Sequence, residues 1–206
     1  MIVCEHEQGT DEWLQDRLGV PSASMFSKII TPTGKPSTSS VGYMNQLLAE
    51  WVAGKPIDVW EGSQAMQDGT EREAEARDQY SFITDNDVTQ VGFCLKNDLR
   101  LSGCSPDGLI GEDGMVEIKS PKASTLIGYH LDGKLPNTYK PQVHGQLWVT
   151  GREWADFFVY HPDIEHFLIR VERDEKYIIA LEKLVNNFTD SMLEKREKLK
   201  SLKEAA

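Results

Sequence analysis

The sequence has few cysteines and no long hydrophobic run. Its three cysteines, Cys4, Cys94 and Cys104, are an odd number and include no C-x-x-C pair, which argues against a disulfide-stapled framework and a four-thiolate cluster. No stretch approaches the roughly 18 consecutive apolar residues of a membrane span, and the N-terminus lacks a basic stretch followed by an apolar one. We therefore expect reduced cysteines, a cytoplasmic protein and no membrane contact.

Basic residues are scarce as well. Lys and Arg total 22 against 33 Asp and Glu, which gives a net charge of -11. Taken alone, this charge argues against a protein that coats nucleic acid, because phosphate binding depends on clustered Lys and Arg. The argument weakens for an enzyme, since carboxylates that hold cations add negative charge until the metal binds, and a narrow channel needs only local positive potential.

The rest of the composition is that of an ordinary globular chain. At 206 residues, 39% hydrophobic and 27% charged, the chain fits a single domain from residue 1 to 206. Periodicity and capping residues predict two short helices, one capped by Thr10 and one capped by Ser22. Longer helices are predicted at 41–52 with a break at Gly54, at 63–82, at 123–131, up to about Thr150 with Gly151 as the C-terminal stop, and at 174–206. Residues 31–40 are a loop by composition, and we expect a mobile strip near a bound substrate.

Short β-prone segments occupy the middle of the chain and the region before the last helix. They are 87–95, 100–105, 115–120, 154–161 and 167–172. Turn-forming Asn-Asp, Pro-Asp-Gly and Asp-Gly sequences separate the first three segments, which predicts neighbouring strands of one sheet. The order of elements predicts an α/β (α+β) fold, with a central mixed β-sheet flanked by helices.

One stretch, residues 104–121, combines acidic and basic side chains in a pattern suited to catalysis. Asp107 lies in the Pro-Asp-Gly turn, and Glu117 and Lys119 alternate on a β-type segment, so their side chains point the same way. A hairpin closed by the turn at 111–114 would bring Asp107 back beside Glu117. The sequence therefore predicts two carboxylates and one ammonium around a common point.

This grouping suits metal-dependent hydrolysis of a phosphodiester. Carboxylate oxygens are ligands for Mg²⁺, which binds phosphate and lowers the pKa of a bound water. Lys119 would orient that water and neutralise phosphate charge. The alternative is an exposed Glu and Lys pair on a solvated strand face, the usual meaning of E-x-K by itself. The Pro-Asp-Gly turn and a Glu-bearing helix upstream favour catalysis.

With these residues, the chain resembles the YqaJ and phage lambda exonuclease family of the PD-(D/E)xK nuclease superfamily, from about Glu7 to about Tyr177. The segments that carry the resemblance are EQGTDEWLQDRLGVPSAS, EREAEAR, CSPDGL, VEIKSP, QVHGQLWVT and VERDEKY. The resemblance implies a restriction-endonuclease-like core. It also implies a Mg²⁺-dependent 5′-to-3′ exonuclease that digests one strand of double-stranded DNA and leaves a 3′ overhang for recombination by strand annealing.

The resemblance further implies roles for single residues. Two Mg²⁺ ions, or Mn²⁺ as a substitute, would be held by Asp107, Glu117, the carbonyl of Ile118 and Glu73. Lys119 would act on the attacking water.

Glu73 has close alternatives in the same segment. Glu71 and Glu75 are its neighbours, and the match to the family favours Glu73 without excluding them. A structural alternative for Glu73 is an i,i+4 ion pair with Arg77.

Four further residues match the pocket that binds the DNA 5′-phosphate in the family, namely Arg17, Ser24, Ser105 and Gln142. Arg offers a forked, permanently charged donor, and serine hydroxyls add neutral donors. The alternatives are a surface charge for Arg17 and helix capping for Ser24. Gln146 stands where related nucleases often have Tyr in a Gln-x-x-x-Tyr pattern, and this departure leaves its role open.

The family also implies partners. They are double-stranded DNA ends, two further copies of the chain in a ring-shaped homotrimer, and a single-strand annealing protein in a bacterial or phage-infected cell. Two other interpretations stay open: an endonuclease of the same fold, which would cut closed circular plasmid, and a catalytically silent nuclease-fold protein that only binds DNA or a partner. The presence of Asp107, Glu117 and Lys119 argues against silence.

Overall fold

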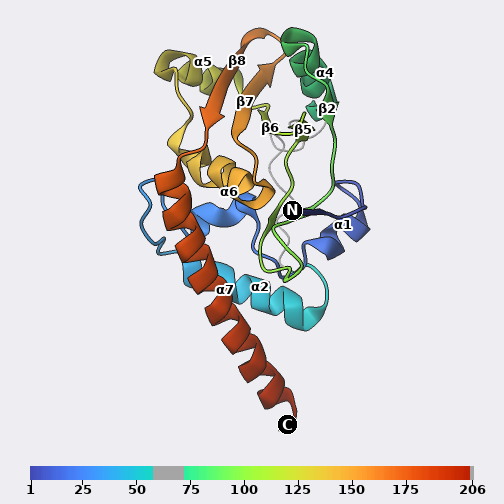
Figure 1. The fold of residues 1–206 in the computed structure, drawn as a ribbon, viewed down its shortest axis with the longest axis vertical. Coiled ribbons are helices and arrows are strands. Elements are labelled where there is room, and N and C mark those ends of the chain that lie inside the picture. Colours follow the sequence, from blue (N-terminus) through green and yellow to red (C-terminus); the bar gives the residue numbers. More distant parts are fainter. Residues whose placement is uncertain (58–71, 205–206) are drawn as a thin grey trace.

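The structure, a computed structural model, describes residues 1–57 and 72–204 (Figure 1). Its helices are α1 (Asp11–Asp16), η1 (Ala23–Lys28), α2 (Ser40–Ala53), α4 (Glu73–Thr84), α5 (Ala123–Asp132), η2 (Asn137–Tyr139), α6 (Lys140–Thr150) and α7 (Glu175–Glu204), where η marks a 3-10 helix. Its strands are β1 (Ile2–Val3), β2 (Val88–Thr89), β3 (Cys94–Leu95), β4 (Gly103–Cys104), β5 (Gly108–Ile110), β6 (Gly114–Lys119), β7 (Trp154–His161) and β8 (Ile164–Glu172).

The main sheet has five strands in the order β2-β5-β6-β7-β8, in which β6 and β7 run parallel and the other neighbours antiparallel. Helix α4 covers one face, where Tyr80 packs with Val116 and Phe158. Helices α5 and α6 cover the other face, where Leu147 packs in one cluster with Phe157. The predicted mixed sheet flanked by helices is confirmed, and alternate residues of β6 face different helices.

The prediction that the three central β-prone segments are neighbours in one sheet is wrong. Residues 87–95 split, because β2 joins the main sheet whereas β3 pairs with β1 and β4 in a separate three-stranded sheet. At Gly92 the N-terminal segment crosses so closely that a Cβ would lie 2.1 Å from the His6 carbonyl oxygen. The partner strand Ile2–Val3 is remote in sequence, so the local pattern did not reveal it.

The hairpin expected between Asp107 and Glu117 is present. Strand β5 pairs antiparallel with β6, with Gly108 opposite Val116, and Asp107 therefore lies beside Glu117. Turn-forming residues at 106–108 concealed β5 in the sequence. Gly108 is required at this point, because a Cβ there would lie 2.1 Å from Val88 Cγ1.

Most of the predicted helix ends are confirmed. Thr10 Oγ1 accepts a hydrogen bond from the Trp13 backbone N–H at 3.2 Å, and Gly54 and Gly151 end α2 and α6 in the left-handed conformation. The helix expected after Ser22 is the 3-10 helix η1, and Ser22 does not cap it through its side chain.

Helix α7 corresponds to the predicted C-terminal helix. Its buried residues include Leu181, Phe188 and Met192, whereas Leu202 is 59% exposed. The helix therefore leaves the body of the protein toward its C-terminal end (Figure 1). No described helix combines the length and the apolarity needed to span a membrane.

Of the helix predicted over 63–82, residues up to 71 lie outside the described chain, and α4 begins at Glu73. The buried carboxylate of Asp156 attaches α4 to the main sheet. The Tyr80 hydroxyl donates to Asp156 Oδ2 at 2.7 Å, and Arg170 donates to both oxygens of Asp156 at 2.9 Å. Because a buried carboxylate is stable only with such partners, this network fixes α4 and thereby the position of Glu73.

Helix α6 is the most deeply buried helix segment of the described chain, with residues 143–149 all buried. It lies in the middle of the molecule beside the start of α7 (Figure 1). Gly145 makes this possible, since a Cβ there would lie 2.5 Å from the ring of Phe26 and 3.2 Å from Ala23.

We expect Gly145→Ala to destabilise the protein by about 1 to 3 kcal/mol, because the added methyl group overpacks the contact between α6 and η1. The matched control is Gly128→Ala in α5, where the added Cβ meets no atom within 4 Å apart from its chain neighbours and the backbone of its own helix. That change should stabilise by up to about 1 kcal/mol through helix propensity. Urea unfolding of both variants checks this, and equal stabilisation by both would contradict the packing described for α6.

Candidate active site

The hairpin of β5 and β6 builds the centre of the site. Asp107 Oδ2 accepts a hydrogen bond from the Ile118 backbone N–H at 2.6 Å, so the Ile118 backbone lies against this carboxylate. Glu117 and Lys119 flank Ile118 and share the other side of the strand. The structure thus brings together the four central residues that the sequence singled out.

Glu117 is buried, with 1% of its surface exposed. Its Oε1 accepts hydrogen bonds from Lys119 Nζ and, at 2.5 Å, from Gln142 Nε2. Its Oε2 accepts a hydrogen bond from Gln146 Nε2, also at 2.5 Å. Helix α6 therefore supplies two amides to the carboxylate that β6 presents.

Glu73 reaches the same place from the first turn of α4. Its carboxylate pairs with Arg77 at 2.6 Å, and Arg77 also donates to the Asp107 carbonyl oxygen at 3.2 Å. The i,i+4 ion pair is thus real, but it lies beside Asp107 and does not remove Glu73 from the site. Glu75 accepts a hydrogen bond from the Tyr160 hydroxyl instead, and Glu71 lies outside the described residues.

The carboxylates repel one another. Burial, together with the negative charges of Glu117 and Glu73, raises the pKa of Asp107 to about 8, against the opposing effects of Lys119 and the Ile118 N–H. Burial lowers the pKa of Lys119, but attraction to Glu117 and Asp107 outweighs it and holds that pKa above the usual lysine value. Lys119 is therefore a cation here, and Asp107 holds a proton near neutral pH.

The hydrogen-bond partners and the ligand chemistry of these residues show whether the site fits a metal ion. Among residues 1–57 and 72–204, no three His, Cys, Asp or Glu side chains already converge as a cation site. Protein donors occupy the carboxylates of Asp107, Glu117 and Glu73. The donors are nonetheless hard oxygens, and the repulsion that raises the pKa of Asp107 is what a divalent cation relieves. The set fits a divalent cation that replaces some of these donors.

A cavity of about 620 Å³ opens beside Asp107 and Glu73, and part of its wall is residues 3–8. Gln8 holds this wall in place, because its Nε2 donates to the carbonyl oxygens of Val91 and Pro106, both at 2.9 Å. The sequence did not indicate a role for Gln8, although this residue stands in the EQGTDEW segment. The cavity gives Asp107 and Glu73 an open side.

Arg17 lies at the end of α1 and is linked to Ser105 through Trp13. The guanidinium stacks 4.1 Å from the centre of the Trp13 ring, and the Trp13 indole N–H donates to Ser105 Oγ at 3.1 Å. Within the described residues Arg17 has no carboxylate partner, and burial lowers its pKa. A desolvated guanidinium without an anion is a receptor suited to phosphate. Trp13 joins two of the four predicted phosphate-binding residues, through contacts that the sequence did not reveal.

The other two predicted phosphate-binding residues have different partners. Ser24 is exposed on η1, and its hydroxyl bonds that of Ser22 at 3.0 Å. Gln142 donates to Glu117. The structure therefore connects Arg17 with Ser105 and Gln142 with the carboxylates, while Ser24 contacts none of the other three among the described hydrogen bonds.

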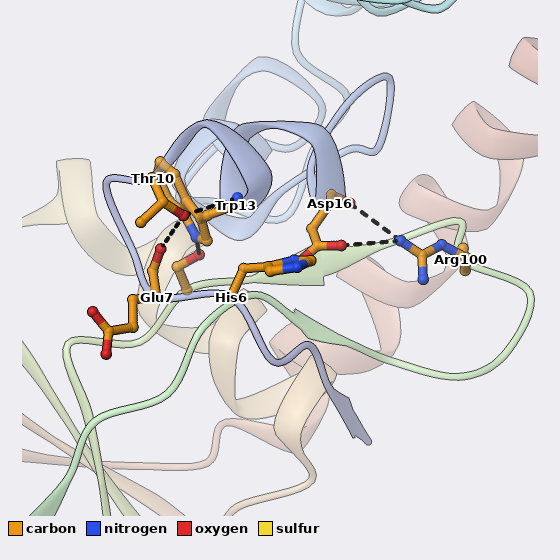
Figure 2. A network of polar contacts seen from close by, with 7 residues as sticks. His6, Glu7, Thr10, Trp13, Asp16 and Arg100 are labelled. Atoms are coloured by element: carbon orange, nitrogen blue, oxygen red, sulfur yellow. Dashed lines mark hydrogen bonds and ion pairs between the residues drawn. The ribbon is translucent and has the colours of Figure 1, made fainter.

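Helix α1 is short and is held by polar contacts at both ends (Figure 2). At its start, Thr10 bonds the Glu7 carbonyl oxygen at 2.8 Å. At its end, Asp16 Oδ2 lies 2.9 Å from His6 Nδ1, and Asp16 Oδ1 lies 3.8 Å from Arg100. These contacts fix the helix that carries Arg17.

We expect the affinity for divalent cations to rise with pH, because Asp107 must lose its proton before it binds an ion. With a pKa of about 8, the ionised fraction grows about 25-fold between pH values of about 6.5 and 8.5. Calorimetric titration of the metal-free protein with MnCl₂ across this range measures the change. Asp107→Asn is the control and should bind weakly at every pH. A wild-type affinity independent of pH would contradict the raised pKa.

Comparisons with known proteins agree with this geometry. Residues 12–153 match the model of the YqaJ-like viral recombinase domain. The crystal structure of an alkaline exonuclease, LHK-Exo, from Laribacter hongkongensis has 34% sequence identity and a TM-score of 0.86, over 96% of this chain and 100% of that chain. The same enzyme in complex with dAMP gives 33% identity and a TM-score of 0.85 over the same shares.

A phage-related exonuclease from Haemophilus somnus shares the fold, with a TM-score of 0.66 over 85% of this chain and 96% of that chain, at 14% identity. Comparison with curated protein sequences gives no significant match. Nucleases of this family generally use divalent metal ions. The chain belongs to the YqaJ-like viral recombinase domain family, and it is a nuclease that resembles the alkaline exonucleases.

Proposed function

We propose that the chain is a Mg²⁺-dependent exonuclease that digests the 5′-ended strand of double-stranded DNA in the 5′-to-3′ direction and leaves a 3′ single-stranded overhang. The observation that carries the proposal is a pair of linked sites. Asp107, Glu117 and Lys119 converge at one, and Arg17 with Ser105 forms the other, through Trp13. Ser105 lies two residues before Asp107, so a terminal phosphate held there stays close to the carboxylates.

The chemistry follows from the residues at the first site. Asp107, Glu117, Glu73 and the Ile118 carbonyl would hold two Mg²⁺ ions, or Mn²⁺, which when bound supply Lewis acidity toward phosphate and a lowered pKa for water. Lys119, charged and paired with Glu117, orients the attacking water and neutralises phosphate charge. Water oxygen bonds to phosphorus and the P–O3′ bond breaks. The released nucleotide keeps its 5′-phosphate and gains a 3′-hydroxyl, and the shortened strand begins with a new 5′-phosphate.

The second site gives the reaction its polarity. Arg17, Ser105, Ser24 and Gln142 would bind the 5′-phosphate, which each cleavage regenerates. This supports stepwise digestion from a 5′ end, because the product strand is again a substrate for the same pocket. Gln142 now donates to Glu117, so phosphate binding by this amide requires that it turn away from the carboxylate.

Assembly and partners belong to the same proposal and rest on the family resemblance. A homotrimeric ring around the DNA would keep an acidic chain, of net charge -11, on its substrate by topology. A single-strand annealing protein would receive the overhang in the cytoplasm of a bacterial or phage-infected cell.

Digestion of linear double-stranded DNA with one 5′-phosphorylated and one unphosphorylated end tests the proposal. With Mg²⁺ we expect loss of the strand that begins with phosphate, because Arg17, which stacks on Trp13 and has no carboxylate partner among the described residues, offers its positive charge to that end. EDTA should stop the reaction, and Lys119→Ala should nearly abolish it. Strand-specific labels and denaturing gels give the readout.

A closed circular plasmid is the control in the same experiment and should stay intact. A cut circle would show that the chain is an endonuclease of this fold. Absence of any digestion, with DNA still bound, would show a silent DNA-binding protein. Either result overturns the exonuclease proposal.

Arg17→Ala should slow digestion from phosphorylated ends by about 10- to 100-fold, the size expected for lost charge-assisted hydrogen bonds. Digestion from unphosphorylated ends should hardly change. The matched control is Lys28→Ala, which removes an exposed cation of η1 and should leave both rates near wild type. The initial rates of digestion from the two kinds of DNA end test this prediction. An equal loss of rate on both ends would show that Arg17 does not bind the 5′-phosphate.

A further inference from the structure

Gln146, whose role the sequence leaves open, lies against the most buried acid of the site. Gln146 and Glu117 are each only 1% exposed, and Gln146 Nε2 donates to Glu117 Oε2 at 2.5 Å. Helix α6 cannot easily shift this amide, because Gly145 next to it lies directly against Phe26. Gln146 is therefore a fixed donor that reaches the carboxylate from the protein interior.

The two oxygens of Glu117 differ in their surroundings. Oε1 accepts from Lys119 and Gln142, which are both only partly buried. Oε2 accepts from the buried Gln146. The donors at Oε1 are therefore more accessible to an incoming cation than the donor at Oε2, which is enclosed.

A neutral amide is a suitable hydrogen-bond donor for Oε2 of Glu117. It fixes the orientation of the carboxylate by a hydrogen bond and leaves its negative charge available, whereas a basic side chain would compete with a cation for that charge. Partners that orient a metal-ligating group in this way typically change metal affinity by about 10- to 100-fold.

The carbonyl end of the Gln146 amide also indicates that this side chain is present for its bond to Glu117. Its Oε1 is buried and has no hydrogen-bond partner among the described residues, which is unfavourable for a residue that only fills the core. The reverse orientation of the amide would point its oxygen at a carboxylate and repel it. The bond to Glu117 therefore accounts for an amide at a place where an apolar side chain would pack without a polar penalty.

We infer that Gln146 is a positioning residue that anchors Oε2 of Glu117 so that Oε1 is presented to a divalent cation. The inference rests on the metal site of the proposed function and deepens it. The two amides of α6 then have separate roles. Gln146 orients the Glu117 carboxylate, and Gln142 leaves that carboxylate to bind phosphate.

The test compares Gln146→Met with Gln142→Met, two isosteric changes one helical turn apart. Calorimetric titration with MnCl₂, without DNA and at a pH of about 8.5, should give a dissociation constant raised about 10- to 100-fold for Gln146→Met. Gln142→Met should bind Mn²⁺ as well as wild type or better, because one competitor for Oε1 is gone. Thermal unfolding monitors the fold, and if Gln146→Met does not fold, the smaller Gln146→Leu serves in its place.

A second readout separates positioning from a general loss of structure. Gln146→Met should keep the wild-type ratio of rates on phosphorylated and unphosphorylated DNA ends while it needs more Mg²⁺ for half-maximal rate, and Gln142→Met should lower the ratio. Wild-type Mn²⁺ affinity in a folded Gln146→Met variant would overturn the inference and leave the proposed function intact. If the wild-type protein bound no Mn²⁺, the proposed metal site would fall and the inference with it.

Discussion

Glu117 is an acid with 1% of its surface exposed, in the central strand of the main sheet. A carboxylate so placed is stable only when its oxygens are paired. Strand β6 supplies Lys119 and helix α6 supplies two amides, so α6 must lie deep in the protein. Gly145 permits that depth, since any side chain there would meet Phe26. The hydrogen bonds that stabilise Glu117 in β6 therefore depend on the deep position of α6, and that position depends on Gly145.

The distribution of positive charge would reconcile an acidic chain with the DNA substrate that we propose. The net charge of -11 describes the whole chain, but the cations that matter are few and fixed. Lys119 forms an ion pair with Glu117. Arg77 bonds both Glu73 and the Asp107 carbonyl oxygen. Arg17 stacks on Trp13. Because buried charges are screened less than exposed ones, a few cations in a shaped site act on phosphate more strongly than their number suggests.

The sequence predicted those parts of the protein that depend on neighbours in the chain. The helix ends at Thr10, Gly54 and Gly151 and the hairpin next to Asp107 follow from local rules of capping and turn formation, and all are present. The pairing of β1 with β3 escaped prediction, because contact between remote segments leaves no local pattern. The same holds for the site: the Asp, Glu and Lys of the motif were visible, whereas the contacts of Gln8, Trp13 and Gln146 arise only from packing.

The wall of the cavity at residues 3–8 has a consequence for dynamics. Strand β1, which leads into this wall, has only two residues, both more than two-fifths exposed, and a single strand partner. Segments with so few buried contacts open locally at a small fraction of the free energy that unfolds the whole protein. We therefore expect local opening of this short strand to release the first residues of the wall while Gln8 still anchors its end and the sheet that holds the carboxylates stays folded.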